Sequence, residues 1–365
     1  MKLIKYKLGD LIRQRRQKND SNDLPICGVT RDGFIPPKQQ DADTSLYNVF
    51  YLKDFVFNPA RMELNAIVFN DRYEKAICSS LYEVFYVHRP EVILPEYLAL
   101  LVKQDWFTRY CKFMGSGSAR EYCRVANISE LEIEVPPIEF QAEMARDNQI
   151  IRDRIELKRR INDNLLAATQ AIYKSWFVDF EPFDNACPPN WKNGCVDDIA
   201  ELYDSMRKPL SSLERADMER AYPYYGAVSI VDYVDDFIFD GEYLLLSEDG
   251  IYVVDENGHP LLQHITGKFW ANNHAHILKG KAGFNEDSLY LFLSNTNMAP
   301  IVTGAAQPKI NQANLKSFPI TIPTSEVVEK FNTLIQPFFD QRLSNEAEVK
   351  KLETLKDLLL SRLVN

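Results

Sequence analysis

The stretch Ile138–Phe177 decides the fold, and it reads IEFQAEMARDNQIIRDRIELKRRINDNLLAATQAIYKSWF. Its apolar residues recur mostly every three or four positions, the spacing of a stripe along a helix. The stripe consists of Met144, Ile151, Ile155, Ile161, Leu165, Ala168, Ile172 and Trp176. The intervening residues are too charged to be buried all round, so we expect a helix over 138–181 that packs against a partner helix. At this length it is a rod of roughly 60 Å.

A second periodic run, 327–363, supplies the partner, and we expect a second long helix over 324–365. Its apolar residues include Phe331, Leu334, Phe338, Leu352, Leu355, Leu359 and Leu363. Shifting the first run by 187 positions superposes Leu165 on Leu352 and Trp176 on Leu363. This match predicts an internal duplication and two antiparallel helices. Pro337 lies inside the second run, where it is expected to kink or break the helix.

Length and composition predict two domains in a reducing compartment. A chain of 365 residues suits two domains with connecting elements. Because it contains no apolar run of about 18 residues and no signal peptide, we expect a cytoplasmic protein with no membrane partner. The six cysteines form no Cys-x-x-Cys pair, which favours buried thiols over disulfides or zinc.

The net charge of −10 arises largely in residues 182–323, where 10 Lys and Arg face 19 Asp and Glu. An acidic balance counts against nonspecific coating of nucleic acid, because such binding is driven by neutralising phosphates. The acidic balance does not exclude a protein that binds nucleic acid through a local basic face.

The order of landmarks predicts an α+β fold with two similar mixed α/β domains, 1–137 and 191–323. A proline-rich linker, 182–190, follows the first helix. The loop 115–120 in the first domain corresponds in position to 303–306 in the second, and Asn127 followed by Leu131 corresponds to Asn311 followed by Leu315. The amino-acid sequences between the landmarks differ, which favours two modules that recognise different targets.

Several motifs in a fixed order carry a family resemblance that spans essentially the whole chain. They are Lys7-Leu8-Gly9-Asp10, the glycine-serine loop, Pro188-Pro189-Asn190-Trp191, Tyr222-Pro223, Asp240-Gly241-Glu242-Tyr243 and Gln307-Pro308. This order resembles the specificity subunit of type I restriction-modification enzymes. The second loop departs from the pattern because it lacks the glycine-serine repeat.

The resemblance implies two target recognition domains, each reading one half of a bipartite site in double-stranded DNA, held apart by the two helices. It also implies that the helices dock two modification (methyltransferase) subunits, and that restriction (translocase-nuclease) subunits join the complex. The chain itself would not be an enzyme. S-adenosylmethionine, ATP and magnesium would bind to the partner subunits, which would methylate adenine and cleave DNA.

Candidate DNA-binding residues are side chains suited to phosphates or base edges, such as Arg and Lys for guanine and Asn and Gln for adenine. In the first domain they are Lys38, Arg61, Arg72, Lys75, Arg109, Lys112, Ser118, Arg120 and Arg124. In the second they are Arg207, Lys208, Arg215, Arg220, Tyr224, Lys268, Asn272, Asn273, Lys279, Lys281, Gln307, Lys309 and Asn311. For each residue, the alternative is a solvated charge or a hydrogen bond that stabilises the fold.

Other motifs do not support catalysis or metal binding. His274-Ala275-His276 has no carboxylate at ligand spacing nearby in the sequence, so a structural or base-reading role is favoured over a metal site. Thr266-Gly267-Lys268-Phe269 lacks the first glycine and the hydroxyl of a phosphate loop. Two alternatives remain: a protein-interaction scaffold with duplicated modules, and a fused methyltransferase-endonuclease, against which the missing cofactor motifs speak.

Overall fold

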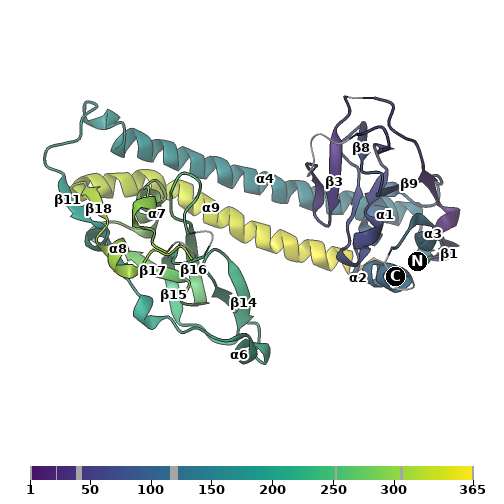
Figure 1. The fold of residues 1–365 in the computed structure, drawn as a ribbon. Coiled ribbons are helices and arrows are strands. Elements are labelled where there is room, and N and C mark those ends of the chain that lie inside the picture. The colour runs from purple at the N-terminus through teal and green to yellow at the C-terminus, as the bar shows by residue number, and fades with distance from the viewer. Residues whose placement is uncertain are drawn as a thin grey trace. The chain divides into compact units, whose positions relative to one another are not determined.

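A computed structural model of the protein describes residues 2–21, 23–37, 43–115, 122–250, 253–304 and 307–363. The chain divides into two compact units, and Figure 1 labels many of their elements. Unit 1 comprises Met1–Leu157 and Val349–Asn365, and unit 2 comprises Lys158–Glu348. Within the described ranges, no helix is both long and apolar enough to cross a membrane.

Unit 1 contains two four-stranded sheets, of order β2-β9-β6-β7 and β4-β3-β8-β5, and a two-stranded ribbon, β1-β10. Its elements in chain order are β1 (Ile4–Lys7), the 3-10 helix η1 (Leu8–Asp10), β2 (Ile12–Arg15), β3 (Ile26–Thr30), β4 (Gly33–Ile35), β5 (Asn48–Tyr51), β6 (Phe55–Phe57), the 3-10 helix η2 (Pro59–Leu64), β7 (Ile67–Phe69), β8 (Lys75–Cys78), β9 (Glu83–Val87), α1 (Pro95–Leu101), α2 (Asp105–Gly115), α3 (Val125–Ser129) and β10 (Glu132–Val135). The first half of α4 (Ile138–Phe177) and the end of α9 (Ser325–Leu360) complete it.

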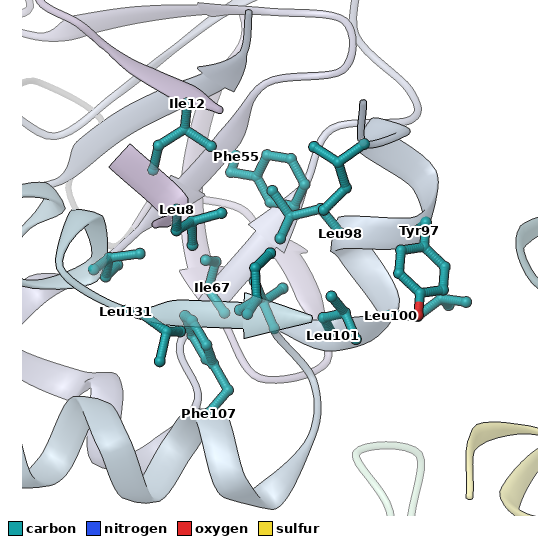
Figure 2. Close-up of a cluster of buried hydrophobic side chains, with 14 of the residues drawn as sticks. Leu8, Ile12, Phe55, Ile67, Tyr97, Leu98, Leu100, Leu101, Phe107 and Leu131 are labelled. Carbon is teal, nitrogen blue, oxygen red and sulfur yellow. The ribbon is translucent and has the colours of Figure 1, made fainter. Parts of the chain in front are cut away.

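The inner strand β6 of the sheet β2-β9-β6-β7 is buried on both faces. Successive side chains of a strand point to opposite faces, so Phe55 and Phe57 of β6 lie in the largest core cluster and Val56 lies in another. Figure 2 shows the larger cluster, in which Leu8, Phe55 and Phe107 come from elements far apart in the sequence. Each fully buried side chain of this kind contributes about 1.5–3 kcal/mol of hydrophobic stabilisation.

Unit 2 contains a six-stranded sheet, of order β12-β17-β15-β16-β13-β14, and a ribbon, β11-β18. Its elements are the second half of α4, the 3-10 helix η3 (Glu181–Phe183), β11 (Lys192–Cys195), α5 (Val196–Ile199), β12 (Ala200–Leu202), the 3-10 helix η4 (Asp204–Met206), α6 (Ser212–Ala216), β13 (Tyr222–Tyr225), β14 (Ile230–Val234), β15 (Phe239–Ser247), β16 (Leu262–Ala271), β17 (Ala275–Gly280), α7 (Glu286–Ser294), the 3-10 helix η5 (Ala299–Ile301), α8 (Gln312–Lys316), β18 (Pro319–Ile322) and most of α9.

The two units open and close with the same elements. In unit 1, β1 pairs with β10 so that Ile4 lies opposite Val135, and in unit 2, β11 pairs with β18 so that Lys192 lies opposite Ile322. A short helix follows each opening strand, and a long helix, α4 or α9, follows each closing strand. This shared order supports the predicted duplication, while the sheets between the ribbons differ in strand number and order.

The helices α4 and α9 contribute to the cores of both units. In unit 1, Ile151 and Ile155 share a buried cluster with Leu359 and Leu363, and Leu352 packs against it. In unit 2, the ring of Trp176 lies 5.8 Å from that of Phe331, at the start of α9. The other predicted α4 residues of the seam in unit 2, Ile161, Leu165 and Ile172, are half-buried.

The helical periodicity predicts that Leu334 and Leu355 lie in the seam between the two helices. This is wrong, because they are 41% and 49% exposed. Ile335 and Phe339 are buried instead, and Phe338 is only half-buried. Leu334-Ile335 and Phe338-Phe339 are adjacent apolar pairs, in which the sequence pattern does not identify the member that faces the core. The buried face of α9 in unit 2 therefore runs through Phe331, Ile335 and Phe339.

A polar contact lies in the seam between α4 and α9 in unit 2. Asn345 is buried, its amide nitrogen donates to Asn162 Oδ1 at 2.7 Å, and its Oδ1 accepts from Lys158 Nζ at 2.9 Å. Lys158 also pairs with Glu348 at 2.8 Å. Since Lys158 meets Glu348 near one end and Trp176 meets Phe331 near the other, the helices are antiparallel within unit 2. A shift of one turn would leave the buried amide unpaired, so this contact favours one register.

Of the kink or break expected at Pro337, the break does not occur, because α9 continues through this residue. Pro337 is exposed, and so is Thr333, whose carbonyl would have accepted the hydrogen bond of an ordinary residue at position 337. The carbonyl that loses its partner thus lies on a solvent-facing side of the helix, where water can replace the missing N–H.

We expect Ile335→Ala to lower the free energy of unfolding by about 2–4 kcal/mol, because it leaves a cavity in a fully buried site. Leu334→Ala removes the same kind of side chain one position earlier from an exposed site, and should cost about 0.5 kcal/mol or less. Urea unfolding followed by circular dichroism measures both. Equal effects would contradict the assignment of the buried face to Ile335.

Candidate nucleic-acid interface

A groove of about 380 Å³ opens on unit 1 and is lined mostly by polar and charged side chains. They come from β2 and the segment after it, from β5, from the turn before β9 with its first residue, and from the start of α3. The lining residues are Gln14, Arg15, Arg16, Lys18, Asn48, Ser80, Tyr82, Glu83, Arg124 and Ala126. With four cations against one carboxylate, this unit 1 groove is a basic surface on an acidic protein, and it suits a phosphate backbone.

Arg15 anchors the groove to the core of unit 1. Its guanidinium donates to both carboxylate oxygens of buried Asp54, at 2.6 and 3.0 Å. It also lies 4.7 Å from the ring centres of both Tyr51 and Tyr86. A bidentate pair between two aromatic rings fixes the guanidinium firmly. Arg15 is therefore a structural residue that holds the end of β2 in place.

The neighbours of Arg15 carry the groups that are suited to reading bases. Arg16 Nε donates to Gln14 Oε1 at 2.9 Å, and Lys18 Nζ donates to Asn48 Oδ1 at 2.8 Å. Arg124 lies 3.6 Å from Glu83 and is mostly exposed. Arg and Gln present the donors and acceptors that match guanine and adenine edges in the major groove. Arg16, Lys18 and Arg124 are exposed, so each can exchange its present contact for a contact to DNA.

Of these groups, sequence reasoning identified only Arg124. Gln14, Arg16 and Lys18 were missed, although they belong to the basic run Arg-Gln-Arg-Arg-Gln-Lys at positions 13–18. Such a run is a recognised sign of a nucleic-acid surface. The sequence of the run does not reveal that β2 pairs with β9. This pairing places the run beside Tyr82, Glu83 and α3.

A second cavity in unit 1, of about 530 Å³, is also rich in cations. Its charged lining residues are Arg31, Arg72, Lys103, Arg146, Arg152 and Lys356 with Asp32, Asp71 and Glu96. Arg72 and Arg152 both approach Asp71, at 3.7 and 3.6 Å. Arg72 is thus one predicted residue that the structure places in a basic cavity.

Among the described residues, the remaining candidates of unit 1 do not line the unit 1 groove. Arg61 is exposed in η2, and Arg109 and Lys112 are exposed on α2. Lys75 is half-buried in β8 and pairs with Asp20 at 3.5 Å. Lys38, Ser118 and Arg120 lie outside the described residues, as does most of the glycine-serine loop.

Several unit 2 candidates stabilise the fold. Tyr224 is buried, and its hydroxyl accepts from the backbone N–H of Leu210 at 3.0 Å. Arg215 pairs with Asp232 at 2.9 Å, with its guanidinium over the ring of Tyr224. The side chains of Asn272 and Asn311 accept from the backbone N–H groups of His274 and Asn314, both at 2.8 Å. For these four residues the structure favours the fold-stabilising alternative.

A buried ionic network surrounds His276, and two more candidates, Arg207 and Lys309, belong to it. His276 is fully buried, its Nδ1 lies 2.6 Å from Asp204 Oδ2, and its Nε2 lies 2.8 Å from the carbonyl oxygen of Ile310. Arg207 pairs with Asp204 at 3.3 Å and with Glu248 at 2.5 Å, and Lys309 pairs with Glu248 at 2.8 Å. Because both ring nitrogens of His276 face acceptors, its hydrogen bonds require the doubly protonated ring.

The fold brings carboxylates to His276, although none stands at ligand spacing from it in the sequence. Asp204 and Glu248 approach the ring from distant parts of the chain. Two carboxylates balanced by Arg207 and Lys309 form ion pairs, and a cation there would meet two fixed positive charges. The position of His276 therefore supports the structural role that the sequence favoured.

The other unit 2 candidates are available at the surface. Lys208, Arg220, Lys268, Asn273, Lys281 and Gln307 are exposed. Lys279 is half-buried, with its ammonium 4.5 Å from the ring centre of Tyr243, and Lys268 lies 4.4 Å from that of Phe237. Lys268 and Lys279 belong to β16 and β17, which both pair with β15.

Comparison with known proteins identifies a consistent set of relatives. Residues 188–356 match the family described as "Type I restriction modification DNA specificity domain". A putative type I restriction enzyme specificity subunit of Haemophilus influenzae is 38% identical over 137 residues, which cover 38% of this chain and only 34% of that protein. The HindI specificity subunit of the same organism is 21% identical, with 99% of this chain and 98% of that protein aligned.

Among solved structures, the crystal structure of a type I restriction-modification S subunit from M. genitalium has a TM-score of 0.62. It is 14% identical in sequence, and the match covers 100% of this chain and 96% of that one. At this identity the likeness concerns the fold alone, and it agrees with a mixed helix and sheet architecture with long helices.

Proposed function

We propose that this chain is a specificity subunit of a type I restriction-modification complex and chooses the DNA sequence on which the complex acts. Two likenesses support this: residues 188–356 match the DNA specificity domain, and the HindI specificity subunit aligns over nearly the whole chain at 21% identity. The observation that supports a DNA-reading role most directly is the unit 1 groove. It gathers Arg16, Gln14 and Arg124 beside a guanidinium that is locked to the core. Recognition by such side chains combines phosphate contacts that position the protein with base contacts that specify the sequence.

The site in this proposal is bipartite. Residues 1–137 and 191–323 form the two target recognition domains, 182–190 is the linker, and 138–181 and 324–365 are the spacer helices. The repeated order of elements supports two modules of common origin, and the different strand orders between the ribbons support two different half-sites. In unit 2, the exposed residues Lys268 and Asn273 are our candidates for DNA contacts.

The catalytic steps belong to partner subunits in this proposal. The chain is a non-enzymatic subunit that docks two methyltransferase subunits along its helices, and restriction subunits join them. S-adenosylmethionine, ATP and magnesium would bind to those partners, where the target adenine would be turned out of the duplex for methylation. Such a complex would act on DNA in the cytoplasm.

Arg16→Ala tests the unit 1 groove, with Arg13→Ala as the matched control. Both remove one arginine from the same segment, but Arg13 does not line the groove. A base contact by Arg16 predicts a loss of about 1–3 kcal/mol in DNA binding and relaxed preference at one base of one half-site. A phosphate contact predicts weaker binding to all sequences and a salt slope reduced by about one.

The measurement is selection of bound duplexes from a random pool, with the modification subunit present, at two salt concentrations. Methylation-aware sequencing of cells that carry the complex gives the site independently. We expect Arg13→Ala to retain the affinity and the site of the parent. If the parent complex enriches no sequence, the result favours the protein-interaction scaffold instead.

A further inference from the structure

Unit 2 contains a second group of ligand-type side chains, made of Glu242, His264 and Asp287. One potential ligand atom from each lies within 4.8 Å of the other two. The residues belong to β15, β16 and α7, so strand pairing and helix packing bring them together. None of the functions considered above uses this group.

Glu242 holds the imidazole of His264 in one orientation. Its Oε1 lies 2.6 Å from His264 Nε2, a short hydrogen bond in which the ring nitrogen donates. With the proton on Nε2, the lone pair of a neutral ring lies on Nδ1, which faces Asp287. A carboxylate that accepts the second N–H of a histidine is the usual support of a metal-binding imidazole.

Asp287 has one carboxylate oxygen that lacks a hydrogen-bond donor. It is 3% exposed, and its buried Oδ1 has no hydrogen-bond donor among the described residues. This oxygen lies 3.5 Å from His264 Nδ1, beyond the normal length of such a hydrogen bond. Leaving a buried carboxylate oxygen unpaired is costly, so a missing positive partner is indicated.

The separation fits two ligands of one metal ion. With metal–nitrogen and metal–oxygen bonds of about 2.1 Å and a tetrahedral angle, the two ligand atoms are about 3.4 Å apart. A cavity of about 240 Å³ reaches the ring of His264 and is also lined by Tyr290, Arg342 and Glu346. The cavity opens the ring of His264 to solvent, whereas Asp287 and Glu242 do not line it.

We propose that His264 Nδ1 and Asp287 Oδ1 bind a divalent transition-metal ion, with Glu242 as the residue that orients the imidazole. An imidazole and carboxylate set with open positions suits Zn²⁺ or Co²⁺ rather than Mg²⁺ or Ca²⁺, which prefer oxygen ligands. The site would tie β16 to α7 within unit 2. It does not depend on the proposed DNA reading.

The two histidine groups of unit 2 differ in what balances their carboxylates. Around His276, Arg207 and Lys309 pair directly with Asp204 and Glu248. Around His264, Glu242 and Asp287 form ion pairs with the imidazole and with no Lys or Arg in the described part of the chain, and the side chain of Arg342 lies over the ring of Phe339. The alternative at His264 is therefore an imidazolium shared by two carboxylates.

The test is Zn²⁺ binding by the full chain, measured by calorimetry, in a background with Cys187→Ser and Cys195→Ser. Cys187 is exposed and Cys195 half-buried, and their thiols would otherwise compete for the ion. We expect one Zn²⁺ site that Asp287→Asn and His264→Gln each weaken at least about 30-fold, whereas Glu242→Gln weakens it about tenfold. His274→Ala, which alters an exposed histidine, should leave the affinity unchanged.

A second measurement is independent of binding heat. Excess Zn²⁺ should raise the melting temperature of the parent, because a ligand of the folded state stabilises it, and should not raise that of Asp287→Asn. Asn has the shape of Asp without its charge, so this variant is expected to fold. Absence of Zn²⁺ binding in the parent, or equal binding in Asp287→Asn, would overturn the proposal in favour of the shared imidazolium.

Discussion

His276→Leu is expected to destabilise unit 2 by about 3–5 kcal/mol, the cost of leaving buried charges without a partner. The substitution removes both ring N–H groups, and it leaves Asp204 Oδ2 and the carbonyl of Ile310 short of donors in a site that is fully buried. Arg207 still pairs with Asp204 and limits the loss. The fold should survive with a lower unfolding midpoint in urea.

His274→Leu is the matched control, two positions earlier. His274 has a side chain that is 48% exposed, and it pairs with Asp249 at 2.7 Å. An exposed pair of this kind is worth about 0–1 kcal/mol. Circular dichroism and tryptophan fluorescence should show that His274→Leu unfolds close to the parent. Equal effects of the two substitutions would show that the His276 network contributes nothing beyond a surface pair.

The same network predicts how the stability of unit 2 depends on pH. Burial alone would raise the pKa of Asp204 and Glu248, but hydrogen bonds and charges from His276, Arg207 and Lys309 hold each pKa below its usual range. A carboxylate with a lowered pKa stabilises the fold fully above its unfolded pKa of about 4, and this contribution is lost as the pH falls through the folded pKa. We therefore expect the urea concentration at the unfolding midpoint to decrease when the pH is lowered below about 4.

A matched insertion in both long helices is expected to abolish modification of the original DNA site while both half-sites stay the same. Seven residues placed between Leu157 and Lys158 of α4, and seven between Glu348 and Val349 of α9, fall at the boundary between the units. Every contact described within each unit is then retained. Seven helical residues add about 10.5 Å, close to the rise of three base pairs.

Methylation-aware sequencing reads out the result, and the expected change is in the unspecified spacer between the half-sites. Because the duplex turns once in about 10 base pairs, a longer spacer also rotates one half-site relative to the other. The insertion is therefore expected to weaken modification even at its preferred spacer. An insertion of seven residues in the linker, after Ala186, is the control and should leave the spacer unchanged. Retention of the original spacer by the helix variant would show that the helices do not set the spacing of the half-sites.

The long helices could be predicted because their signal is local and repeated. Apolar residues every three or four positions identify α4 and α9 without any knowledge of the rest of the chain. The face was harder to assign, since Leu334 and Ile335 are both apolar and only packing decides between them. The sequence left open whether Pro337 kinks or breaks its helix. The helix α9 continues through it, because a proline on a solvent-facing side leaves its unpaired carbonyl accessible to water.

The sites could not be predicted, because they join residues that are distant in sequence. Asp204 reaches His276 only through the pairing of β12 with β17, and Glu248 reaches it because β15 pairs with β17. The unit 1 groove depends in the same way on the pairing of β2 with β9. Residue type alone placed Tyr224 among the DNA contacts, whereas burial makes it part of the core.

The double-sided burial of β6 and β9 has an evolutionary consequence. Phe55, Val56 and Phe57 of β6 and Val84 and Phe85 of β9 are all fully buried, so these positions do not tolerate a polar replacement without a large loss of stability. New sequence preferences would then have to arise at the rim of the sheet, where Gln14, Arg16 and Arg124 project from the strand end and from α3. Homologues that prefer different half-sites are expected to diverge there while their strand interiors drift only among apolar residues.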